Sequence, residues 1–299
     1  MRVPDSSYYN MLLPQLERLN AKQINLQNQA ATGQRVFRAS EDPAAVGRAL
    51  ELQGEKDQIQ QFARNISRGE AVSNASFNSI EGMQEILLRS DEIAVKANGL
   101  TSKDGFPAYA IEVDKMLEDF VNLANSTYLG EYLHAGTATQ TAPFEVTRTG
   151  PDGQIDSATY VGHADNLPTF RITETQDFSP FSRTSTNAAM VDAMDNLMAL
   201  RQALSDEDVP AIQAAQQAIR TQEDVLIEEM SLIGSRLTTL EIVGKRSEQA
   251  FYNYETTISD NVDADLTETL VQLNSASIAY EAALQSGAQI MNLSLLNYI

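Results

Sequence analysis

Residues 208–258 read DVPAIQAAQQAIRTQEDVLIEEMSLIGSRLTTLEIVGKRSEQAFYNYETTI, and within them a column of mostly apolar residues recurs every seven positions. That column consists of Ile212, Ile219, Leu226, Ile233, Leu240, Ser247 and Tyr254, and a second column lies four residues behind it. This repeat is typical of a helix that packs lengthwise on another helix. At about 1.5 Å per residue the helix is roughly 75 Å long, so it needs partners of similar length.

A second long seam begins at Asp42 and Pro43, where an acidic N-cap precedes a proline at the first helical position. From there the chain repeats apolar or small residues every seven positions, at Ala45, Leu52, Ile59, Ile66, Ser73, Ile80, Leu87 and Ala94. The two seams predict two long helices that pack along one another. We therefore expect a mainly α fold built as a long antiparallel helical bundle or coiled coil.

The two chain ends carry thinner seams, in which apolar residues step by four and three. The predicted assembly interface of these terminal helices consists of Leu12, Leu16, Leu19, Leu26, Leu266, Leu270, Leu273, Tyr280, Leu284 and Met291. After Glu281 the chain has no charged side chain, which is unusual for a helix with a solvent-facing side. We expect residues of about 1–40 and 262–299 to order only against other copies of the chain, because so narrow a stripe is marginal alone.

The middle of the chain changes character. A third helix is expected over residues 107–133 and a fourth over 187–204, with Thr, Gly, Pro and aromatic residues enriched between them. Short alternating runs at 144–148, 157–161 and 169–173 predict strands, with a turn at Pro151-Asp152-Gly153 between the first two. This region is predicted to be a small β-rich insertion.

Three domains follow from these patterns. We expect a terminal helix pair, a long helical bundle and a β-rich insertion, formed respectively by residues 1–42 with 262–299, 43–135 with 184–261, and 136–183.

Composition excludes several classes of partner. The 299 residues carry a formal charge of -20, which argues against nucleic acid or an anionic membrane surface. The chain has no cysteine, so it forms no disulfide and no thiolate metal site. Residues 282–299 contain too many polar side chains for a membrane span. Residues 1–20 lack the apolar core of a secretory signal, so any export is expected to use another route.

The sequence contains no recognisable catalytic motif. The only histidines, His134 and His163, have no acidic or cysteine partner at a recognisable spacing, and we expect a hydrogen-bonded or exposed loop role for both. We predict no catalytic, cofactor-binding or metal-binding residues, and no enzyme activity.

Three short motifs resemble the flagellin family, which includes flagellins and the flagellar hook-associated proteins. The first is GQRV at 33–36 followed by SEDP at 40–43; the second is GEYLHAG at 130–136, which resembles the entry to the β domain of hook-associated members. The third is the ending LSLLNYI at 293–299. The residues that carry the first two motifs are Gly33, Arg35, Ser40, Asp42, Pro43, Gly130, Tyr132, Gly136, Pro143 and Phe144. His134 departs from the pattern, because an aromatic residue is common there.

The resemblance implies a structural protein of the bacterial flagellum, outside the cell and exported without a cleaved signal peptide. Its implied partners are copies of itself in a ring, hook-associated protein 1, flagellin and a dedicated export chaperone. Two alternatives stay open: a filament-forming flagellin, and an unrelated long-helix module such as a secreted effector or adhesin.

Overall fold

The computed structural model describes residues 5–99, 105–149, 153–163 and 167–296, with only the backbone described at 5–10 and 290–296. The helices are α1 (Asp5–Thr32), α2 (Pro43–Asn98), α3 (Phe106–Ala124), α4 (Thr184–Ser205), α5 (Val209–Val262) and α6 (Leu266–Leu296). The strands are β1 (Thr127–Tyr128), β2 (Glu131–Tyr132), β3 (Phe144–Thr149), β4 (Gln154–Tyr160), β5 (Phe170–Arg171) and β6 (Asp177–Phe178). This confirms the predicted mainly α fold with a small β-rich region.

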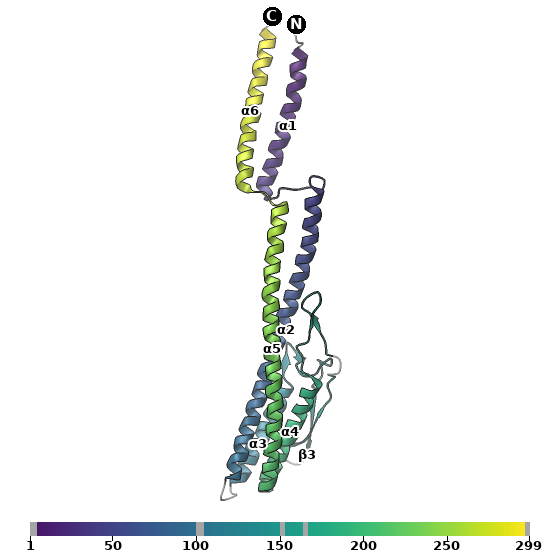
Figure 1. The fold of residues 1–299 in the computed structure, drawn as a ribbon, viewed down its shortest axis with the longest axis vertical. Coiled ribbons are helices and arrows are strands. Elements are labelled where there is room, and N and C mark those ends of the chain that lie inside the picture. Colours follow the sequence, from purple (N-terminus) through teal and green to yellow (C-terminus); the bar gives the residue numbers. More distant parts are fainter. Residues whose placement is uncertain (1–4, 100–104, 150–152, 164–166, 297–299) are drawn as a thin grey trace. The chain divides into compact units, whose positions relative to one another are not determined.

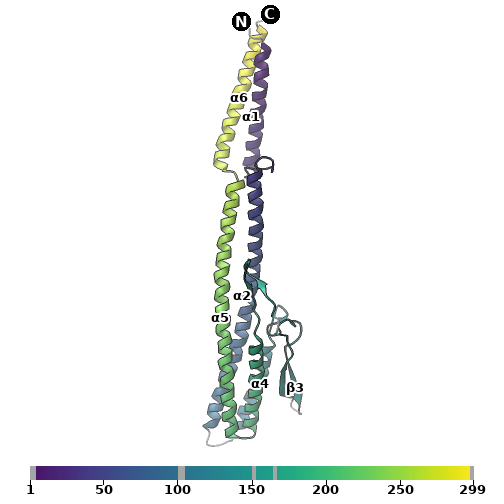
Figure 2. The same ribbon diagram turned by 45° about the vertical axis from the view of Figure 1, so that its right-hand side comes forward.

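The chain divides into two compact units. Unit 1 comprises residues 1–58 and 250–299, and unit 2 comprises residues 59–249. In unit 1, α1 and α6 pack side by side and run antiparallel, so that both termini lie at the same end of the pair (Figures 1 and 2).

In unit 2, α2 and α5 pack antiparallel, as predicted. The side chain of Gln84 donates to Glu223 at 3.1 Å, and farther along α2 Asp91 accepts from Arg220 at 2.7 Å. The predicted seven-residue columns face inward. Within this unit the column members Ile59 and Ser247, near its ends, are half-buried, and the others are buried: Ile66, Ser73, Ile80, Leu87, Ala94, Ile212, Ile219, Leu226, Ile233 and Leu240.

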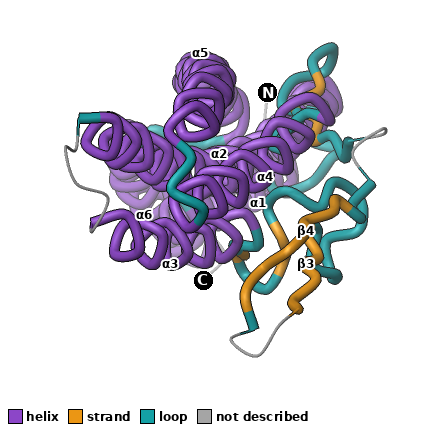
Figure 3. Tube along the Cα trace, turned by 90° about the horizontal axis from the view of Figure 1, so that it is seen from below, coloured by secondary structure: helices purple, strands orange, loops and turns teal. Residues whose placement is uncertain are grey.

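The helices α3 and α4 complete the core of unit 2. They pack against each other, and their fully buried side chains include Leu117, Phe120, Met190 and Met194. Strands β3 and β4 form an antiparallel hairpin that lies beside these helices (Figure 3). Ile155 of β4 is buried in the same core, and the buried Arg201 of α4 ties the hairpin down by donating to the Ile155 carbonyl at 2.9 Å and to Asp114 at 2.8 Å.

A second, smaller cluster holds the end of the β-rich region on α2 and α5. It contains Ile66, Ile172, Phe178, Leu240 and Val243. A Cβ atom at Gly69 would lie 3.1 Å from the Phe178 ring, so the glycine permits this close approach.

The predicted helix over 107–133 was wrong beyond Ala124. Asn125 is the C-cap residue of α3, and its side chain bonds both the carbonyl (2.9 Å) and the N–H (3.0 Å) of Phe144, which fixes the helix end to the start of β3. Residues 127–132 instead form the β1–β2 hairpin. The β-rich region therefore begins before residue 136, and among the described residues its strands form three separate two-stranded sheets.

The other predicted elements agree to within a few residues. The strand predicted at 157–161 begins three residues earlier, at Gln154. The predicted turn at Pro151-Asp152-Gly153 lies largely outside the described residues. The three-domain division stays a prediction.

Candidate assembly site at the terminal helix pair

The first motif forms a hydrogen-bonded joint inside unit 1. The N–H of Arg35 donates to the Val262 carbonyl and the N–H of Ala264 donates to the Gly33 carbonyl, both at 2.8 Å. Gln34 and Asp263 thereby form an antiparallel bridge. Gly33 has a φ of +73°, a conformation that glycine adopts without the steric cost of a side chain. The motif glycine thus ends α1 and turns the chain onto the start of α6.

Charged motif residues lock this joint. The guanidinium of Arg35 donates to the Asn261 carbonyl at 2.5 Å and lies 3.4 Å from the Asp42 carboxylate. Asp42 caps α2 by accepting from the Ala45 N–H at 3.0 Å, as predicted. That hydrogen bond, assisted by Arg35, lowers the pKa of Asp42 below its usual value. Ser40 is exposed.

The adjoining helix start is capped in the same way. Asp265 accepts from the N–H groups of Thr267 at 2.8 Å and Glu268 at 3.1 Å, and so begins α6. Glu41 accepts from the Phe37 N–H at 3.0 Å within the loop of the motif. Long-range backbone bonds therefore close the joint, and local caps at Asp42 and Asp265 fix the starts of the two helices beside it.

The predicted stripe of α1 is the one that turns inward. Leu12, Leu16 and Leu19 are half-buried and Leu26 is buried, whereas Leu13 and Ile24 are exposed. A four-and-three repeat of leucines therefore located the α6-facing side of α1.

The predicted assembly residues of α6 lie on two different sides of the helix. Leu273 and Tyr280 are half-buried, but Leu266, Leu270 and Leu284 are 48%, 55% and 45% exposed and do not face α1. The inward side of α6 repeats Thr269, Leu273, Ala276, Tyr280, Ala283 and Gly287 instead. The side chain of Met291 lies outside the described residues.

Small residues on α6 allow the close packing that the leucine pattern missed. A Cβ atom at Gly287 would lie 2.7 Å from Cδ2 of Leu12, so a larger residue there would push Leu12 away. Burial favours the large apolar residue only where space exists, and here the space is taken by Leu12. The sequence pattern that marks the inward side of α6 is the interval of seven between Thr269, Ala276 and Ala283. These side chains are too small for a hydropathy pattern to reveal them.

Pairing leaves much apolar surface uncovered. On α6, Leu266, Leu270, Val271, Ile278 and Leu284 remain exposed, and on α1 Met11, Leu13 and Ile24 do. A single chain gains nothing from apolar side chains that face water. These residues define a surface suited to further helix contacts.

The second motif forms the neck of the β-rich region in unit 2. Leu129 and Gly130 have φ values of +51° and +82°, which produce the two-residue turn between β1 and β2. Gly136, at φ +66°, bridges to His163. Tyr132 is half-buried, and its N–H donates to the Thr139 carbonyl at 2.9 Å. Pro143 and Phe144 are buried, and the Phe144 ring stacks at a tilt on Tyr160 with 5.3 Å between centroids.

His134 sits at the centre of this neck. Its ring nitrogens lie 3.3 Å from the Ser79 hydroxyl and 3.1 Å from the Ser182 hydroxyl, and its carbonyl accepts from Tyr160 and Asn187. Burial lowers the pKa of His134 to about 4. The ring and both serines are buried, so this serine–histidine contact joins α2, the neck and the start of α4 rather than facing a substrate.

The described residues form neither a metal-binding cluster nor a membrane-spanning helix. There, no three His, Asp or Glu side chains come together in a group that would hold a metal ion. None of the helices, as far as they are described, combines the length and the apolarity needed to cross a membrane.

Both motifs lie within one family match. Residues 7–139 match the family described as bacterial flagellin N-terminal helical region. Over these residues the chain is similar to the N-terminal region of flagellins. The match includes nearly all of α1, the first motif and residues 130–136 of the second, so the motifs that resembled the flagellin family in sequence occupy defined structural positions in it.

Relatives extend the similarity beyond the flagellin-type region. The chain is 24% identical over 309 residues to flagellar hook-associated protein 3 of Salmonella typhimurium, covering 96% of this chain and 94% of the relative. The flagellar hook-associated protein 3 of Escherichia coli K12 is also 24% identical, with 99% and 98% covered. The fold is similar to the flagellar junction protein FlgL of Legionella pneumophila, at a TM-score of 0.57 and 12% identity over 72% of this chain and 100% of that one.

Proposed function

We propose that this protein is a structural adaptor of the bacterial flagellum that forms the junction between the hook and the flagellin filament. Two relatives that match it over nearly their whole length are hook-associated proteins, which favours an adaptor over a filament-forming flagellin. Its proposed partners are further copies in a ring, hook-associated protein 1 on one side, flagellin on the other, and an export chaperone before assembly. The role is structural rather than enzymatic.

The observation that carries this proposal is the apolar surface left open on the α1–α6 pair. Fully burying a leucine contributes about 1.5 to 3 kcal/mol relative to exposure. The half-exposed leucines of α6 can still gain part of this free energy when a neighbouring copy covers them. Ordering a segment on binding costs about 2 to 5 kcal/mol. Covering several such leucines with neighbouring copies offsets that ordering cost. A lone chain does not obtain this burial free energy.

The acidic composition fits the same proposal. A chain with a formal charge of -20 repels its copies in solution, which keeps it soluble before assembly. The end of α6 carries no charge after Glu281, so repulsion is least where we place the contacts. Assembly is then driven by apolar burial at the ends of the chain.

The decisive variant is Leu284→Asp, with Leu284→Met as its control. Because Leu284 is exposed in the single chain, we expect the thermal melt of the isolated protein to stay unchanged with aspartate. We expect cells that carry this variant to complete their hooks but lose flagellin to the medium, as seen by electron microscopy and by protein in the culture fluid. The methionine variant keeps an apolar side chain and should assemble normally.

Two results would contradict the proposal. A melt lowered by many degrees would place Leu284 in the core of the single chain. Strong hydrogen-exchange protection of residues 270–284 in the dilute protein would show that the pair orders without neighbours. Purified protein that grows long filaments on seeds, without another flagellin, would favour the filament-forming alternative.

A further inference from the structure

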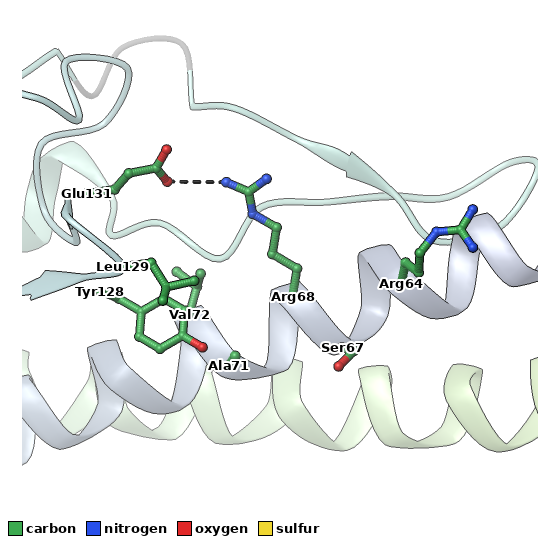
Figure 4. Close-up of a pocket in the computed structure, with 8 residues that line it drawn as sticks. All are labelled: Arg64, Ser67, Arg68, Ala71, Val72, Tyr128, Leu129 and Glu131. Carbon is green, nitrogen blue, oxygen red and sulfur yellow. Dashed lines mark hydrogen bonds and ion pairs between the residues drawn. The ribbon is translucent and has the colours of Figure 1, made fainter.

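A groove in unit 2 lies between α2 and the β1–β2 hairpin of the neck. It encloses about 570 Å³ and is lined by Arg64, Ser67, Arg68, Ala71, Val72, Tyr128, Leu129 and Glu131. Figure 4 shows Leu129, Tyr128 and Val72 together at one end and Arg64 at the other. Arg68 lies between them and forms an ion pair with Glu131, which lies near Leu129. The groove is therefore apolar at one end and cationic at the other.

Leu129 is placed unfavourably for folding. It adopts a φ of +51°, which strains a residue with a side chain, and that side chain is 87% exposed. A glycine or asparagine would make the same turn without the strain, and a polar side chain would cost nothing in water. Since Leu129 adds nothing to the core, its apolar side chain is better explained by a contact outside the chain.

The two arginines of the groove differ in their partners. Arg68 pairs with Glu131 at 3.2 Å and lies over the Phe170 ring at 5.2 Å from its centroid. Arg64 donates to the amide of Gln61 at 2.7 Å, and among the described residues it has no carboxylate within ion-pair distance. Arg64 is exposed in a chain with twice as many acidic as basic side chains, so it remains open to an outside carboxylate.

The turn between α4 and α5 has the complementary chemistry. It holds Asp206, Glu207 and Asp208, the only run of three acidic residues in the sequence, and all three are exposed. Val209 and the exposed Pro210 follow immediately. Three carboxylates next to two apolar residues match a groove that has arginines at one end and a leucine at the other.

We infer that this groove receives the acidic α4–α5 turn of a second copy of the chain. The same copy cannot supply the turn. Gly69, between the groove residues Arg68 and Ala71, packs by Leu240 of α5, and 32 residues of continuous helix separate Leu240 from Asp208. That is about 50 Å. The contact joins two different surfaces, and contacts of this kind form a ring where the rotation between copies closes.

This inference rests on the proposed assembly of copies but uses different residues from it. The proposed junction contacts lie on α1 and α6, whereas the groove and the acidic turn lie in unit 2. A variant of either surface therefore tests one contact and leaves the residues of the other unchanged.

The test uses the absence of cysteine from the chain. One full-length copy carries Ser67→Cys in the groove and another carries Ser205→Cys beside the acidic turn. In flagella assembled from both, we expect a mixed dimer on oxidation or with a short bis-maleimide. We expect neither variant alone to give more than a small part of that yield. Equal cross-linking in the single-variant flagella would show that the link is not between groove and turn, and would overturn the inference.

Charge reversal provides the second arm of the test. On this cysteine pair, Arg64→Glu with Arg68→Glu should reduce the mixed dimer roughly tenfold, and adding Asp206→Lys with Glu207→Lys should restore it. Asp208 is left unchanged because its carboxylate accepts from the Ala211 N–H and caps α5. Arg246→Glu is the matched control, because it reverses an exposed arginine of α5 outside the groove. Failure of the restoring pair, or cross-linking of Ser67→Cys to another flagellar component, would overturn the inference. If flagella form in these variants, the proposed junction role does not depend on the contact between groove and turn.

Discussion

The core of unit 2 and the α1–α6 pair of unit 1 are both helical, yet they bury their apolar residues to different degrees. In unit 2, Leu117, Leu197, Met190 and other core side chains are fully buried. On α6, Ala276 is the one apolar side chain that is buried among the described residues, while Leu266, Leu270, Leu273 and Leu284 are half-buried or exposed. Free energy for folding the chain is therefore concentrated in unit 2, and the terminal pair keeps apolar surface for contacts with other molecules.

The largest expected difference comes from the same substitution in the two regions. Leu197→Ala removes a fully buried side chain and leaves a cavity, which should cost about 2 to 5 kcal/mol of unfolding free energy. Leu270→Ala removes a side chain that is more than half exposed and should cost under about 1 kcal/mol. Because the chain has no tryptophan, denaturant titration followed by far-ultraviolet circular dichroism is the suitable measurement. Similar losses of unfolding free energy at both positions would contradict the difference in burial between unit 2 and the α1–α6 pair.

The pH dependence of unit 2 should give a smaller effect. The unfolded pKa of a histidine is 6.5 and burial lowers that of His134 to about 4, so the neutral ring stabilises the fold above about pH 6.5. As the pH falls below that value the unfolded chain takes up a proton that the folded chain refuses, and stability is lost until about pH 4. The total loss is about 3 kcal/mol.

His134→Gln provides the control for this titration. The amide keeps a donor and an acceptor near Ser79 and Ser182 but takes up no proton. We expect the unfolding free energy of the parent to fall between about pH 6.5 and 5, where carboxylates still stay charged, and that of the variant to stay level. A parent that shows no slope in this window would mean that the ring is accessible to water.

The smallest expected effects distinguish two glycines of unit 1. Gly287→Ala places a methyl group 2.7 Å from Leu12 and should loosen the α1–α6 pair, seen as faster hydrogen exchange in α1 of the assembled protein. Gly54→Ala has nothing within 4 Å of the new Cβ atom and should stabilise α2 by up to about 1 kcal/mol. If Gly287→Ala also slowed exchange, Leu12 would have room to move and the tight contact would be refuted.

Local patterns in the sequence predicted most of the helical structure. A seven-residue repeat records which side of a helix is covered wherever large apolar residues are buried, and this held along α2, α5 and α1. The Asp42–Pro43 start of α2 was predictable for the same reason, since an N-cap involves only residues within one turn. The motifs of the joint and the neck also marked real structural positions, at Gly33, Gly130 and Gly136.

Tertiary structure decided what depends on residues far apart in the chain. The end of α3 is fixed to β3 because the side chain of Asn125 bonds Phe144, nineteen residues later. The space that Leu12 leaves on the inward side of α6 admits a glycine at position 287 and no larger residue without a shift of Leu12. His134 is buried because Ser79 and Ser182 arrive from distant helices. Periodicity records burial on one helix, but it holds no information about which neighbour arrives or how much room that neighbour leaves.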